Sequence, residues 1–110
     1  MKKTLLYDSG GFNVYAPYQT ETNLLDNLSN YDIVEIITGM PSSIDTCKFS
    51  VKFNITYILE SQKIGTFTLY QESNAWISFT DTTFTVQRTY SYGNYPPDYP
   101  QIYKIYGIKY

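Results

Sequence analysis

The last ten residues, 101–110, limit what this chain folds into more than any other stretch. They are rich in Ile and Tyr, which favour extended backbone. Strand alternation places large side chains on both faces: Ile102, Tyr106, Ile108 and Tyr110 on one, Tyr103 and Ile105 on the other. A strand that is bulky on both faces belongs inside a sandwich or at an interface. The rest of the chain is therefore expected to supply sheet partners and a second layer.

Further strands are expected along most of the chain. Residues 48–59 carry the clearest pattern, because apolar and polar side chains alternate throughout, which indicates one buried and one solvated face. Residues 20–30 instead predict one short turn of helix, with Leu24, Leu25 and Leu28 directed inward. The other expected strands cover residues 3–8, 12–15, 31–38, 65–72, 74–80 and 83–90.

The composition supports the same class of fold. The 110 residues include 13 Tyr, 6 Phe and 1 Trp, and such residues suit a pleated sheet. The length fits one domain with one modest core, and no repeat or linker divides it. We therefore predict that residues 1–110 form a single all-β domain, an antiparallel β-sandwich that is jelly-roll-like and has one short helical turn.

Charge and hydropathy argue against several partners. The net charge of −2, with no basic stripe, disfavours nucleic-acid binding. No apolar run approaches the length of a membrane span, so membrane insertion is not expected. The single Cys47 permits no internal disulfide and fits synthesis in the cytosol.

Few residues in the sequence suit catalysis. The absence of His removes the usual general base and the commonest metal ligand. Cys47 is interpreted as a small filler near a strand start, and one Cys makes no zinc site. The carboxylates that a glycosidase would need are interpreted as turn residues: Glu60, Glu72, Asp81 and Asp98. We predict no catalytic residue, no metal and no cofactor.

Residues 90–100 hold the one loop that is a candidate for specific binding. Three prolines and Gly93-Asn94 prevent regular strand pairing there. Its tyrosines suit packing on the loop's own prolines or on a neighbouring subunit, which is the simpler interpretation, and also stacking on a sugar or contact with a host protein. The candidate binding residues are Tyr92, Asn94, Tyr95, Asp98 and Tyr99.

The number of aromatic residues also predicts self-association. A core of this size does not readily hide so many rings, and large exposed apolar patches are uncommon on monomers. The candidate interface residues are Trp76, Tyr103, Tyr106 and Tyr110.

Both ends of the chain resemble a known class of module. The motifs are Leu5-Leu6-Tyr7-Asp8-Ser9-Gly10, the leucines of residues 25–28, Asn30-Tyr31-Asp32-Ile33-Val34-Glu35-Ile36 and Tyr103-Lys104-Ile105-Tyr106-Gly107-Ile108. Together they resemble small β-sandwich head or tip domains in fibre, baseplate or head-fibre proteins of tailed phages that infect low-GC bacteria. These domains normally follow a long shaft, whereas this sequence begins at Met1. The departure leads us to expect a separately encoded tip or decoration protein.

The resemblance implies a non-enzymatic virion protein that forms a homotrimer, contacts other virion proteins and contributes to host attachment through a cell-surface glycan or protein. Purely structural decoration of the particle is the close alternative. A different class, a small phage-encoded inhibitor of a host enzyme or defence complex, stays open. Such inhibitors often present a strongly acidic face, and the interspersed lysines here do not favour one.

Overall fold

The computed structural model describes residues 1–10, 20–39, 48–61, 63–70, 73–90 and 101–110. For residues 39, 48, 49, 61, 63–70, 73–76, 87–90 and 101 it describes the backbone alone. Within these ranges the elements are β1 (Lys2–Asp8), β2 (Thr22–Asn23), the 3₁₀ helix η1 (Leu28–Asn30), β3 (Ile33–Gly39), β4 (Lys48–Asn54), α1 (Ile55–Ser61), β5 (Lys63–Tyr70), β6 (Ser73–Phe79), β7 (Thr83–Tyr90) and β8 (Gln101–Lys109).

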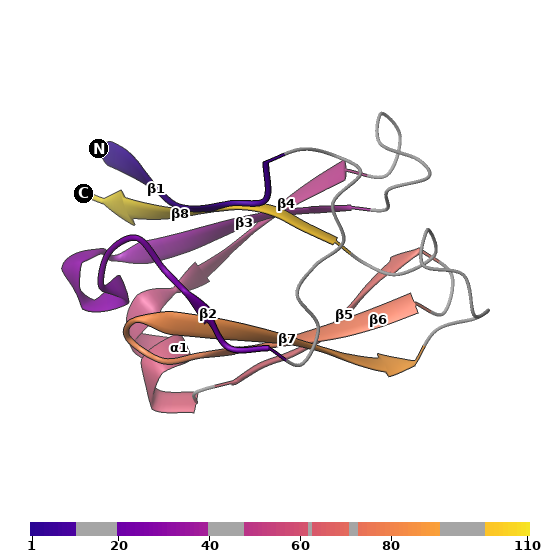
Figure 1. The fold of residues 1–110 in the computed structure, drawn as a ribbon. Helices are drawn as coiled ribbons and strands as arrows, with labels where there is room; N and C mark the ends of the chain where they lie inside the picture. The colour runs from indigo at the N-terminus through magenta and orange to yellow at the C-terminus, as the bar shows by residue number, and fades with distance from the viewer. Residues whose placement is uncertain (11–19, 40–47, 62, 71–72, 91–100) are drawn as a thin grey trace.

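The strands form two antiparallel sheets that lie one above the other (Figure 1). The first sheet has the order β1-β8-β3-β4 and the second has the order β2-β7-β6-β5. The predicted all-β antiparallel sandwich is therefore confirmed. Its jelly-roll-like feature is the nested pairing of β1 with β8 and of β2 with β7. The middle strands instead pair with their neighbours in sequence, β3 with β4 and β5 with β6.

The C-terminal strand has the interior position that its sequence predicts. β8 pairs with β1 on one side and with β3 on the other. The predicted grouping of its faces was wrong for Ile102, which belongs with Ile105 in the core rather than with Tyr106. A register shift in the β3–β8 pairing, between Ile37 and Thr38, adds one residue to β8 and reverses the alternation there.

The core lies between the two sheets and is mainly aliphatic. Ile36 and Ile105 from the first sheet and Ile77 and Val86 from the second are fully buried. Tyr7 of β1 reaches across to Phe84 of β7, with ring centroids 4.8 Å apart and an edge-on geometry. Aromatic pairs in this arrangement contribute about 0.5–1.5 kcal/mol beyond simple burial.

The strand expected over residues 48–59 was wrong beyond Asn54, because α1 begins at Ile55. The side chain of Asn54 accepts a hydrogen bond from the backbone N–H of Tyr57 at 3.3 Å, which is the geometry of a helix N-cap. Ile55 and Ile58, three residues apart, are both buried on the inner side of the helix. The apolar run satisfies helix and strand spacing alike, and the cap decides between them.

The helical turn expected in residues 20–30 is present as η1, preceded by β2. Leu24 and Leu28 are buried as predicted, but Leu25 is 72% exposed, so its expected inward orientation was wrong. The segment crosses an end of the sandwich and is fixed by backbone bonds to both sheets, from Leu25 N–H to Leu6 O and from Leu24 N–H to Thr82 O, each 2.8 Å.

Candidate functional site

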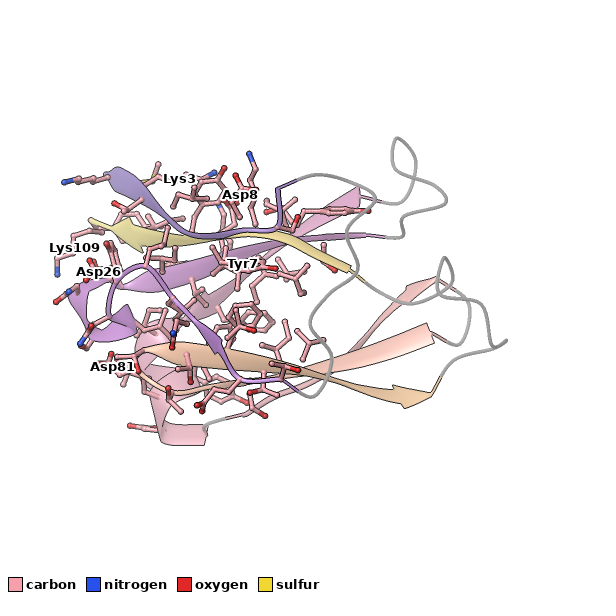
Figure 2. All side chains as sticks on the ribbon, in the orientation of Figure 1. Lys3, Tyr7, Asp8, Asp26, Asp81 and Lys109 are labelled. Carbon is pink, nitrogen blue, oxygen red and sulfur yellow. The ribbon has the colours of Figure 1, made fainter. Side chains whose placement is uncertain are left out.

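The outer face of the first sheet is the candidate site. The pairing register assigns its members from β1, β8, β3 and β4. They are Lys3, Leu5 and Asp8; Lys104, Tyr106 and Ile108; Ile33, Glu35 and Ile37; and Ser50, Lys52 and Asn54. Figure 2 shows Lys3 and Asp8 on the side of this sheet away from the second sheet, while Tyr7 lies between the sheets. No described helix or strand covers the face (Figure 1).

The outer face carries a band of apolar side chains. Leu5, Ile33, Ile37 and Tyr106 are all partly exposed on it. Ile108 is only 1% exposed, although it stands outside the cluster of residues that forms the sandwich core. In a sheet with one solvated face, apolar and polar side chains alternate along each strand, so the solvated face is normally polar. Here apolar and aromatic side chains stand among the charged ones on the outer face as well as in the core. Such a face is suited to contact with another surface.

Glu35 lies at the centre of the outer face and ties its four strands together. Its carboxylate is 2.6 Å from Lys3 Nζ on β1 and 3.9 Å from Lys52 Nζ on β4. The hydroxyl of Ser50 donates to Glu35 Oε2 at 2.7 Å. Lys3 Nζ also stands 4.3 Å from the centre of the Tyr106 ring, a cation–π contact that brings in β8.

The network controls the ionisation of its members. Burial opposes the charge on Glu35, but the hydrogen bonds from Lys3 and Ser50 and the charges of Lys3 and Lys52 outweigh it and lower the pKa of Glu35. The hydrogen bond to Glu35 raises the pKa of Lys3. Glu35 is therefore an ionised, internally compensated carboxylate, and at neutral pH it is a poor proton donor.

The loop residues that the sequence singles out for binding, Tyr92, Asn94, Tyr95, Asp98 and Tyr99, lie outside the described residues. Their role stays a prediction.

The four candidate interface residues are dispersed. Tyr106 is on the outer face, Tyr103 is 4% exposed, and Tyr110 follows β8 and is 72% exposed. Trp76 is in β6, opposite Gln87 of β7, and the structure describes its backbone alone. Tyr106 and Tyr110, four residues apart toward the C-terminal end of β8, are thus both accessible, which leaves the interface prediction open for both.

The candidate carboxylates fall in different places. Glu60 is exposed on α1, and Asp81 is in the turn between β6 and β7. Asp81 was expected to be a solvated turn residue, but it accepts hydrogen bonds from Asn27 and Ser29. Glu72, Asp98 and Cys47 lie outside the described residues. Among the residues that are described, no three His, Cys, Asp or Glu side chains are grouped to hold a metal.

The sequence analysis missed the outer face. Its signal was present in residues 33–37, where Ile33 and Ile37 stand on the face opposite to Val34 and Ile36, with Glu35 as the sole charge between them. In residues 101–110 the same pattern, with large side chains on both faces, did indicate Tyr106 and Ile108.

Comparison with known proteins does not assign the chain to a family. Neither a protein-family model nor a curated protein matches the sequence. None of the helices in the described part of the chain has the length and apolar character to span a bilayer.

Proposed function

We propose that this chain is a non-enzymatic binding module of a phage particle, a fibre, baseplate or capsid-decoration component that works by presenting a stiff surface. The observation that carries the proposal is the outer face, where partly exposed Leu5, Ile33 and Ile37 surround a carboxylate that is already compensated. Apolar contact area favours binding, and a buried charge does not oppose binding when it is already paired within the chain.

The ionisation of Glu35 supports binding over catalysis. A general acid works best with a pKa near the operating pH, whereas the pKa of Glu35 is lowered. The side chains that hold it, Lys3, Ser50 and Lys52, are arranged to keep its charge fixed. They rigidify the sheet instead of leaving a group poised for proton transfer.

The assignment to a phage particle rests on the sequence motifs at both ends of the chain. Three of the four motifs fall in adjacent strands of the first sheet, at the end of β1, the start of β3 and over most of β8. The resembling domains are commonly homotrimeric and serve in host attachment, and both properties are part of the proposal. The candidate attachment residues remain those of the loop predicted over residues 90–100.

Mass spectrometry of purified particles from the phage that encodes this chain tests the assignment. We expect the protein at a fixed ratio to the major capsid or tail proteins. Its absence from particles, together with its presence in infected cells, would overturn the virion role and favour an inhibitor of a host enzyme.

Attachment is tested separately by binding of the purified protein to host cells. Replacing Tyr92, Tyr95 and Tyr99 together by Ala is expected to abolish binding. The control is Glu21→Ala, which truncates an exposed side chain next to β2 that belongs neither to the loop nor to the outer face. Unchanged binding by the triple variant would remove the loop from the proposal and leave the outer face as the contact surface.

A further inference from the structure

Charge is unevenly divided between the first sheet and the rest of the chain. Six of the eight Lys and Arg residues lie in β1, β4 and β8, against two of the ten carboxylates in the same sheet. The four strands therefore carry a formal charge of +4, and the remaining residues carry −6. The net charge of the whole chain, −2, does not reveal this separation.

The outer face joins positive charge to apolar area. Lys52 and Lys104 are exposed there beside the partly exposed Ile37 and Tyr106. Asp8, opposite Lys104, is the exposed acid of the face, so its three lysines outnumber its two acids by one. The one buried acid of the face, Glu35, is compensated by Lys3 and Lys52, so it does not repel an acidic partner. The surface that fits this face has an apolar centre and carboxylates around it.

The end of the sandwich that carries both termini and α1 (Figure 1) combines exposed apolar side chains with carboxylates. It also carries Lys109 (Figure 2), which is 3.8 Å from Asp32 and so is compensated within the chain. Tyr57 is 57% exposed, and Glu60, one turn further along α1, is exposed on the same side of the helix. Leu25 and Tyr110 are each 72% exposed. Figure 2 places Asp26 and Asp81 at this end as well. We call this surface the terminal end.

We propose that the outer face of one copy of this chain docks on the terminal end of a second copy. The contact is head-to-tail, because two different surfaces meet, so it closes into a ring or extends according to its rotation. The inference rests on the proposed function, since it names the partner of the same face. Aliphatic side chains such as Ile33 and Ile37 do not stack on sugars as rings do, which favours a protein over a glycan on this surface.

Light scattering of the purified chain, from low to high micromolar concentration and at low and high salt, measures the association. We expect concentration-dependent oligomers that weaken as salt rises, because exposed charges are screened. Lys104→Glu on the outer face and Glu60→Lys on the terminal end should each weaken association about tenfold or more. Circular dichroism establishes that each variant keeps its fold.

The decisive experiment mixes the two variants. A head-to-tail contact predicts that Lys104→Glu and Glu60→Lys associate with each other, because each retains the surface that the other lacks. Glu21→Lys makes the same charge change near β2 and should leave association unchanged. A wild-type chain that is monomeric throughout, or variants that associate as the wild type does, would overturn the proposal. Mass spectrometry of particles would still decide the virion role independently.

Discussion

The carboxylate of Asp81, in the turn between β6 and β7, accepts a hydrogen bond from the backbone N–H of Ser29 at 2.7 Å. The Ser29 hydroxyl at 3.2 Å and the Asn27 side-chain amide at 2.9 Å donate to its second oxygen. Asn27 precedes η1 but makes no capping bond with its own side chain. Asp81 supplies the missing acceptor from the second sheet, so it fixes the segment that closes the terminal end.

Replacing Asp81 by Ala should lower the free energy of unfolding by about 1–3 kcal/mol, because three donors lose their acceptor at once. Urea unfolding followed by circular dichroism measures the change. Ser29→Ala is the matched control, since it removes only the longest of the three bonds and should cost under about 1 kcal/mol. Equal effects of the two substitutions would show that Asp81 does not hold this segment.

Gly107 of β8 lies directly under the ring of Tyr31. A Cβ at this position would stand 2.6 Å from Tyr31 Cγ, well inside contact distance. The Tyr31 ring has little room to move, because its hydroxyl donates to Asp26 at 2.7 Å. We expect Gly107→Ala to destabilise the fold by about 1–3 kcal/mol through this clash.

A double-mutant cycle separates the clash from other effects of the new methyl group. In a Tyr31→Ala background, the cost of Gly107→Ala should fall by at least about 1 kcal/mol, because alanine lacks the Cγ and Cδ atoms that the new methyl group would meet. Thermal unfolding of the four proteins supplies the comparison. Additive costs would mean that the Tyr31 ring is not the obstacle.

The boundary between β4 and α1 depends on Asn54. We expect Asn54→Ala to lower stability by about 0.5–2 kcal/mol, whereas Asn54→Asp, which keeps an acceptor for the Tyr57 N–H, should stay close to the wild type. Chemical denaturation of both variants measures the difference. If the alanine and aspartate variants are equally stable, the side chain does not cap α1.

The same boundary shows how far the sequence determines the fold. β7 was predicted to its ends because Phe84 and Val86 alternate with threonines between clear turn signals. The pattern of residues 55–59 is ambiguous. Ile55, Ile58 and Leu59 have the spacing of a helix, whereas Ile55, Tyr57 and Leu59 have the spacing of a strand. The cap at Asn54 favours the helix over the strand at this point. From the sequence alone, Asn54 can be recognised as a cap only if the end of the preceding strand is already known.

The candidate site was less predictable, because it depends on pairing between distant strands. Lys3, Glu35 and Lys52 are far apart in sequence, and only the order β1-β8-β3-β4 brings them onto one face. The register shift at Tyr103 further changes which residues of β8 face outward. Local alternation identifies that a strand exists, but it does not give its neighbours.

The compensated carboxylate of Glu35 gives stability a specific pH dependence. Its folded pKa lies below the ordinary value of 4.5, so its stabilising contribution is fully present above about pH 4.5 and is lost as the pH falls through the lowered pKa. Replacement by Gln removes the charge that Lys3 and Lys52 face, and should cost about 1–2 kcal/mol at pH 7.

The difference between Glu35→Gln and the wild type should therefore shrink as the pH is lowered from 4.5, since the wild-type carboxyl becomes neutral as well. Urea unfolding from pH 7 to pH 2 measures it. Glu21→Gln is the control, because it removes one exposed negative charge near β2 and leaves the outer face intact. A difference between Glu35→Gln and the wild type that stays constant over this range would mean that the ion pairs of Glu35 do not stabilise the first sheet.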